Sequence, residues 1–126
     1  MGYMAHRNEF IEYLLELLQG VGEVKARAMF GGFGLYHYNG IEQDGIMFAL
    51  VADDVLYLKT DEENLSDFEE RGLQAFRYER NGKPFSMSYS EAPGEVLDDP
   101  DEMVYWARKS VDAATRNAAK KRGKNR

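Results

Sequence analysis

Apolar positions near the start of the chain follow a helical period, at Phe10, Leu14, Leu17, Leu18 and Val21. This spacing predicts an amphipathic helix over residues 6–19. Gly20 and Gly22 follow directly, and glycine supplies the permissive backbone at which a helix can stop.

The apolar period shortens to two residues beyond this helix, which predicts a half-buried strand. The alternation runs through Val24, Lys25, Ala26, Arg27, Ala28 and Met29. Three further strands are expected over residues 35–38, 46–51 and 55–59. Turn signals separate them at Asn39-Gly40, Asp44-Gly45 and Asp53-Asp54. The uninterrupted apolar run 46–51 is typical of a central strand covered on both faces, so the four strands should form a meander.

A short second helix is expected after these strands. Thr60 and Glu63 have the spacing of a capping box, which predicts that the helix begins beside them. Gly72 and Leu73 fit a Schellman stop at its end. The pair Asn81-Gly82 then lies between two alternating segments and predicts a β-hairpin.

The last predicted helix begins at Asp99, which can cap it, with Pro100 at the first helical position. Its inner face should consist of Met103, Trp106, Ala107, Ser110, Ala113 and Ala114. The full order is therefore α-β-β-β-β-α-β-β-α. Such an order predicts an α+β fold, with an antiparallel sheet of about six strands and helices packed on it.

The length of 126 residues fits one domain, which we place at residues 1–117, followed by a basic, frayed tail over 118–126. The absence of cysteine excludes disulfides, thiolate metal ligands and cysteine nucleophiles. No signal-peptide pattern opens the chain, and its apolar runs are shorter than the ~20 residues that span a bilayer. We therefore expect a cytoplasmic protein without a membrane partner.

Charge is distributed unevenly along the chain. The net charge is −6, but residues 108–126 hold eight Lys or Arg and one acid, which leaves a net of −13 over residues 1–107. A basic helix end and tail could bind a nucleic acid backbone. Alternatively, the cations favour the helix dipole and keep a frayed end soluble. The candidate nucleic-acid residues are Arg108, Lys109, Arg116, Lys120, Lys121 and Arg122.

No set of residues in the sequence resembles a catalytic site. The two histidines, His6 and His37, lie on different elements, and Ser86 and Ser88 alternate with larger residues as on the wetter face of a strand. The acidic runs at 61–63 and 98–102 open helices and lack the spacing of a calcium loop. We predict no catalytic residue, cofactor or metal ligand.

Glycines gather at Gly31, Gly32 and Gly34. A phosphate-binding glycine loop runs from a strand into a helix, often with a lysine. Here the glycines connect two expected strands without a lysine nearby. They therefore predict a backbone bend or bulge with positive φ and close backbone approach.

Aromatic and methionine side chains are frequent for a chain of this size, with eight Tyr, seven Phe and six Met. They could complete the core at the margins of the sheet, or they could form an exposed patch that binds a protein. A homodimer could cover such a patch. The candidate partner surface comprises Tyr36, Tyr57, Tyr78, Met87 and Tyr89.

Three blocks carry a family resemblance. Residues 27–36 read RAMFGGFGLY, residues 47–61 read MFALVADDVLYLKTD, and the third block reads FRYERNGKP at 76–84 with MSY at 87–89. In this order, over residues 8–117, they resemble the N-terminal domain of the TfoX (Sxy) family. The signature positions expected to be structural are Met29, Phe30, Gly31, Gly32 and Gly34.

The resemblance implies an α+β fold of the secretion-chaperone-like type and a role in regulating DNA-uptake competence together with transcriptional regulators. It supplies no catalytic residue. Full-length family members carry a second domain that resembles helical DNA-binding modules, whereas residues 118–126 form a short basic tail. The connection over residues 39–44 is also longer than the family pattern suggests.

Our leading hypothesis is a non-enzymatic module that binds a protein partner, such as a transcription factor, and that self-associates. The alternative is direct nucleic-acid binding through the basic C-terminal helix and tail. An enzyme acting on a small molecule is a third class. It would need a pocket that holds His37 near a buried carboxylate and a hydroxyl.

Overall fold

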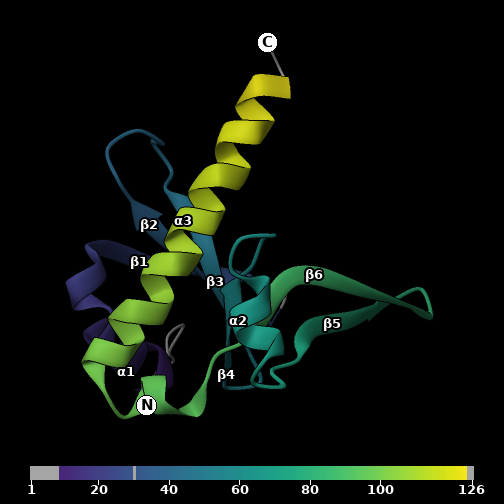
Figure 1. The fold of residues 1–126 in the computed structure, drawn as a ribbon, viewed down its shortest axis with the longest axis horizontal. Helices are drawn as coiled ribbons and strands as arrows, with labels where there is room; N and C mark the ends of the chain where they lie inside the picture. Colours follow the sequence, from purple (N-terminus) through teal and green to yellow (C-terminus); the bar gives the residue numbers. More distant parts are fainter. Residues whose placement is uncertain (1–8, 30, 125–126) are drawn as a thin grey trace.

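A computed structural model describes residues 9–29 and 31–124 of the protein, which form one six-stranded antiparallel sheet with helices on it (Figure 1). The strands are β1 (Glu23–Met29), β2 (Gly32–Tyr38), β3 (Ile46–Ala52), β4 (Val55–Lys59), β5 (Ala75–Arg80) and β6 (Lys83–Glu91). The helices are α1 (Glu9–Leu17), α2 (Leu65–Glu69) and α3 (Pro100–Lys124), with 3-10 turns η1 (Gln19–Val21) and η2 (Gly94–Leu97). The predicted α+β class and order of elements are confirmed.

The strand order across the sheet is β1-β2-β3-β4-β6-β5, so the predicted meander of the first four strands is confirmed. Asp53 and Asp54 connect β3 to β4 with φ of 52° and 60°, and Asn81 and Gly82 connect β5 to β6 with φ of 54° and 77°. Positive φ at both central residues matches the right-handed twist of the paired strands.

A bulge in β3 determines which of its side chains face the helices. Leu35 pairs with Ala49 and Tyr36 pairs with Met47, so Phe48 is an extra residue on β3. Phe48 and Ala49 both belong to the core cluster, whereas Leu50 is buried but lies outside it. Residues 48–51 are all buried, as expected of a strand covered on both faces.

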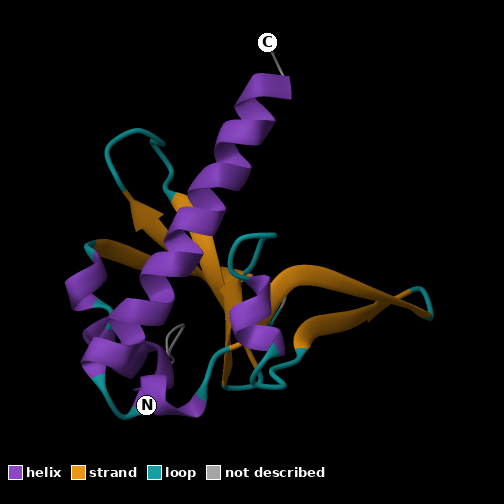
Figure 2. Ribbon diagram, viewed as in Figure 1, coloured by secondary structure: helices purple, strands orange, loops and turns teal. Residues whose placement is uncertain are grey.

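All three α-helices contribute to one core on a single side of the sheet (Figure 2). The sheet residues of this core include Leu35, Phe48, Ala49, Val51, Leu56 and Leu58, and the helical residues include Ile11, Leu14, Phe68, Met103 and Trp106. The predicted first helix is present as α1 followed by η1, and residues 6–8 of that prediction lie outside the described residues.

The predicted start of α2 is wrong. The helix begins at Leu65, and Thr60 is a buried residue whose N–H donates to the Ser88 carbonyl of β6 at 2.9 Å. Asp61 and Asn64 replace the expected capping box, because Asp61 Oδ1 accepts from the Glu63 N–H at 2.9 Å and Asn64 Oδ1 accepts from the Asp61 N–H at 2.8 Å. The end of α2 is as predicted.

The Schellman stop of α2 joins Leu73 N–H to the Phe68 carbonyl at 3.0 Å, with Gly72 at φ +69°. This bond holds the chain as it leaves the helix for β5. Phe68 itself is fully buried, so the same residue anchors the helix end and fills the core.

Helix α3 crosses the sheet and carries the predicted inner face. Asp99 Oδ1 accepts from the Asp101 N–H at 2.9 Å, which makes Asp99 the N-cap ahead of Pro100. All six predicted inner-face residues are at most 5% exposed. The helix continues to Lys124, so residues 118–124 extend α3 where a frayed tail was expected.

The β5–β6 hairpin extends away from the rest of the sheet (Figure 1). Only the base of this hairpin pairs with β4, through Tyr89, Ser90 and Glu91. Its outer residues 77–86 are exposed on both sides, Ser86 among them. A two-stranded ribbon has little stability alone, so this hairpin depends on its aromatic contacts with the sheet.

Candidate functional site

The side of the sheet that faces away from the core has no helix on it among the described residues (Figure 2). Strand alternation places on this side the residues between the core positions. We call it the open face. It includes Lys25, Arg27, Met29, Tyr36, Tyr38, Met47, Leu50, Tyr57, Lys59, Phe76, Met87 and Tyr89, and the acids Glu23 and Glu91 lie on it opposite Tyr38 and Tyr57.

Gly34 makes room for side chains on the open face. A Cβ at Gly34 would lie 2.8 Å from Met29 Sδ, 3.1 Å from Met47 Sδ and 3.1 Å from the Tyr36 ring. The two thioethers and the tyrosine therefore converge over a position that has no side chain. Because methionine is flexible and polarisable, this part of the face can adapt its shape to a ligand.

An apolar hollow of about 40 Å³ lies beside this cluster. It is lined by Met29, Gly32, Phe33, Leu50, Val51, Ala52, Phe76 and Met87. The lining comes from β1, β2, β3 and the β5–β6 hairpin, so the hairpin forms one wall. The volume suits the tip of a single apolar side chain.

Four aromatic rings form a row that continues the open face onto the hairpin. Tyr57 and Phe76 meet edge-on with ring centroids 4.9 Å apart. Phe76 stacks on Tyr78 at 6.1 Å, and Tyr78 stacks on Phe85 at 5.7 Å. The two outer rings are the most exposed, with Tyr78 at 38% and Phe85 at 43%.

Cations cover the tyrosine rings at the β1 end of the open face. The Arg27 guanidinium lies 4.2 Å from the Tyr36 ring centroid, and its Nη2 donates to the Asp44 carbonyl at 2.6 Å and to the Tyr38 hydroxyl. Lys25 Nζ lies 5.0 Å from the Tyr38 ring centroid. These contacts hold the two cations on the face by cation–π attraction.

Lys59 and Tyr89 form the corresponding pair at the β4–β6 end, with Lys59 Nζ 5.2 Å from the ring centroid. Burial raises the pKa of Tyr89 to about 12, so its hydroxyl stays protonated. Burial also lowers the pKa of Lys59, and the nearby charge of Lys121 lowers it further. Lys59 is thus a partly desolvated cation that an added carboxylate would stabilise.

The candidate partner residues lie together on this side of the molecule. Tyr36, Tyr57 and Met87 are half-buried, and Tyr78 is exposed on the hairpin. Tyr89 is only 6% exposed and acts as packing beneath Lys59. The same aromatic set therefore packs against itself and also forms part of the molecular surface, and protein binding by that surface stays a prediction.

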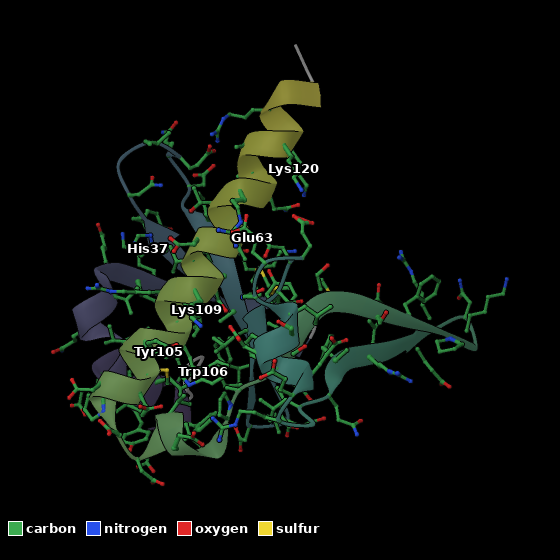
Figure 3. All side chains as sticks on the ribbon, viewed as in Figure 1. His37, Glu63, Tyr105, Trp106, Lys109 and Lys120 are labelled. Atoms are coloured by element: carbon green, nitrogen blue, oxygen red, sulfur yellow. The ribbon has the colours of Figure 1, made fainter. Side chains whose placement is uncertain are left out.

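Most candidate nucleic-acid cations of α3 form ion pairs with acids of the same molecule, and Figure 3 labels two of them, Lys109 and Lys120. Lys109 pairs with Asp67 at 2.9 Å, and Lys120 pairs with Glu62 at 3.2 Å. Arg116 binds Asp61 through two nitrogens at 2.7 and 3.0 Å and also pairs with Glu63 at 3.2 Å. Arg122 pairs with Glu42, Arg108 donates to the Gly20 carbonyl at 3.1 Å, and Lys121 is exposed.

These ion pairs explain the acidic run before α2. Its carboxylates lie beside α3 and hold that helix against the β4–α2 connection. A phosphate backbone would have to displace them before it could bind Lys109, Arg116 or Lys120, which makes α3 a poor electrostatic surface for nucleic acid. Direct nucleic-acid binding by α3 stays a prediction.

Acid should weaken this attachment of α3. The bidentate hydrogen bond from Arg116 holds the pKa of Asp61 below its ordinary value of 3.8. The stabilisation is therefore present above that value and is lost as pH falls through the lower pKa of the folded state. Asp61→Asn keeps the oxygen that accepts from Glu63, and we expect it to cost about 1 kcal/mol at pH 7 and to flatten the stability profile below about pH 4.

The measurement is urea unfolding of both proteins between neutral pH and pH 2. Glu95→Gln is the matched control, because Glu95 pairs with Arg71 in a more exposed position, with side chains 40% and 42% exposed. The free energy of unfolding of Glu95→Gln should therefore follow the wild-type dependence on pH more closely than that of Asp61→Asn does. Equal acid sensitivity of the wild type and Asp61→Asn would contradict the role assigned to this carboxylate.

His37 does not form part of a catalytic arrangement in the described residues. Its Nε2 lies 3.1 Å from the Val21 carbonyl, and its ring meets Phe48 edge-on at 6.5 Å. These contacts join β2 to η1 and the core. His6 lies outside the described residues.

One protein-family model matches most of the chain. The model described as the TfoX N-terminal domain matches residues 16–114, from the end of α1 through most of α3. The chain belongs to the TfoX N-terminal domain family. A comparison with curated proteins finds no match. No described helix of this TfoX N-terminal domain is long and apolar enough to cross a membrane.

The signature of this TfoX N-terminal domain surrounds the β1–β2 turn. Gly31 has φ +78° in the turn, and Gly32 and Gly34 are the first and third residues of β2. Met29 packs over Gly34, and Phe30 lies outside the described residues. The glycines allow positive φ at the turn and close approach on the open face, in agreement with the expected bend.

Lys25 and Arg27 are the surface residues that the sequence interpretation missed. They alternate with Val24 and Ala26 in β1, and this alternation alone indicates a shared face. The predicted meander already made β1 and β2 neighbours, and only their register was needed to place Lys25 opposite Tyr36. The aromatic and cationic residues could then have been assigned to one surface of this TfoX N-terminal domain.

Proposed function

We propose that this TfoX N-terminal domain is a non-enzymatic regulatory module that binds a protein partner through the open face. The observation that carries the proposal is the helix-free side of the sheet, where adaptable methionines, an apolar hollow and an aromatic row adjoin one another. Surfaces of this composition are typical of protein interfaces.

Family membership supports the biological setting of the proposal. We propose that the partner is a cytoplasmic regulator of transcription and that binding serves the control of DNA-uptake competence. The paired cations of α3 favour this protein-binding mode over direct contact with DNA, because four of the six candidates already bind acids.

Site-specific photocrosslinking in the source cell tests the proposal. Benzoylphenylalanine replaces Tyr36 or Tyr78 on the partner surface, and Tyr105, which is 55% exposed on α3, serves as the matched tyrosine position on the helical side. We expect the two partner-surface positions to form protein adducts that resist nuclease, and the α3 position to form far fewer.

Two outcomes would contradict the proposal. Adducts from Tyr105 alone would move the interface to the helical side, and adducts that nuclease removes would indicate nucleic acid as the ligand. Thermal unfolding of each substituted protein checks that the fold is retained before crosslinking is compared.

A further inference from the structure

The cations of the open face differ from those of α3 in the groups that they contact. Arg27 has no acidic ion-pair partner among the described residues, since its polar contacts are a carbonyl and a hydroxyl. Lys59 likewise contacts a ring and lacks a described acidic ion-pair partner, and Lys25 has only a loose pair with Glu23 at 3.5 Å, with both side chains about 60% exposed. The cations of α3, in contrast, are mostly paired. Arg27 and Lys59 are therefore available on the open face to an acidic ligand.

The sheet presents side chains, not backbone, to a ligand on this face. The backbone groups of β2, β3 and β4 already bond to neighbouring strands. An extended peptide laid across them would bury its own N–H and C=O groups without partners. A helix satisfies its backbone internally and can offer one apolar stripe to the sheet.

We infer that the open face binds an acidic amphipathic helix of a partner protein. An apolar side chain of that helix occupies the hollow between Met29, Leu50 and Met87, and its carboxylates pair with Arg27 and Lys25. This inference rests on the proposed function and names the chemistry of the partner. It also completes the architecture, because the second side of the sheet gains the helical layer that the first side already has.

A single strand of nucleic acid fits the face less well. Bases bind such sheets by stacking on exposed rings. Here Arg27 covers the Tyr36 ring, and Lys25 lies over the Tyr38 ring. Gly45 also approaches the Tyr38 ring, since a Cβ there would lie 2.8 Å from it.

A second copy of the chain also fits less well. A two-fold dimer through the open face would bring the same surface of each copy together. The three cations of one copy would then meet a surface that carries the same three cations and, among the described residues, only two acids, Glu23 and Glu91. An acidic helix from a different protein avoids this repulsion.

Selection from a displayed library of helical peptides tests the inference without presupposing a sequence. Peptides of roughly 20 residues, long enough to form isolated helices, are selected against the full chain. We expect the enriched peptides to be acidic and amphipathic. Their affinity should fall about tenfold for the Lys25→Gln/Arg27→Gln variant, as loss of charged hydrogen bonds implies.

The matched control is Lys120→Gln/Arg122→Gln, which removes the same two residue types from exposed ion pairs near the end of α3, on the helical side of the sheet. It should change affinity by less than about twofold if only long-range charge is lost. Thermal unfolding of both variants confirms that they are folded.

Several results would overturn the inference. The inference is wrong if the selection enriches neutral or basic peptides or enriches none. It is also wrong if the two variants lose the same affinity for the selected peptides. Displacement of the bound peptide by a thymidine 20-mer would indicate that the open face binds nucleic acid. A dimer in sedimentation that the selected peptide dissociates would indicate that a second copy of the chain binds there. If the peptide selection fails but Tyr36 and Tyr78 still crosslink to a protein in cells, the acidic helix is wrong and the proposed protein-binding function stands. If acidic peptides are selected but no protein crosslinks form in cells, the proposed function is wrong.

Discussion

Replacing Gly32 with alanine should lower the free energy of unfolding by about 3 kcal/mol, at the upper end of the usual cost of overpacking. A Cβ at this position would lie 2.1 Å from the Val51 carbonyl oxygen and 3.2 Å from its carbon. Both atoms belong to the backbone of β3, so no side-chain rotation can relieve the overlap. The β2–β3 pairing must shift, which we expect to detect by urea unfolding.

Two other glycines provide a graded control for this substitution. Gly94→Ala should change stability by less than about 0.5 kcal/mol, because nothing lies within 4 Å of its added Cβ and its φ is not positive. Gly34→Ala should fall between the two, because its closest neighbour is the flexible Met29 Sδ at 2.8 Å. If Gly32→Ala were as mild as Gly94→Ala, close backbone approach would not explain the signature glycine.

The substitutions at Gly32 and Gly34 also distinguish an effect on the stability of the fold from an effect on the shape of the open face. Gly34→Ala pushes aside Met29 and Met47 on the open face, so it should disturb the shape of that face more than the stability of the fold. Gly32→Ala acts on the strand pairing itself. The family signature therefore combines a position that the sheet requires with a position that shapes its exposed side.

Local sequence signals were sufficient for most of the fold. The α3 cap at Asp99 and the Asn81-Gly82 turn depend on neighbouring residues, and both were predicted correctly. The start of α2 was wrong because Thr60 continues the pairing of β4 with β6, a contact with Ser88 that local spacing does not contain. Strand pairing across the sheet thus overrode a local capping signal.

The candidate sites were harder to predict because charge pairing is a tertiary property. The basic residues of α3 lie more than 40 positions from the acids that bind them, such as Asp61 for Arg116. Nothing in the local sequence distinguishes such a paired cation from an available one like Arg27. The surface aromatic residues were found by composition, whereas the cations beside them became apparent only through the β1–β2 register.

Replacing Phe68 with alanine should lower the free energy of unfolding by about 4 kcal/mol. Phe68 is fully buried, and its ring meets Trp106 edge-on at 5.2 Å, so the substitution opens a cavity between α2 and α3. Trp106 is the single tryptophan of the chain, and its fluorescence should shift to longer wavelength as water reaches the cavity. Urea unfolding followed by this fluorescence measures both effects.

Tyr105→Ala is the matched control, because Tyr105 also meets Trp106 edge-on, at 6.1 Å, but is 55% exposed. It loses a comparable ring contact without creating a cavity, so the cost should stay below about 1 kcal/mol. Equal losses for the two variants would mean that the ring contact, and not burial, stabilises this region. The expected difference instead identifies burial of Phe68 as the interaction that holds α2, and with it the acids that bind α3, against the core.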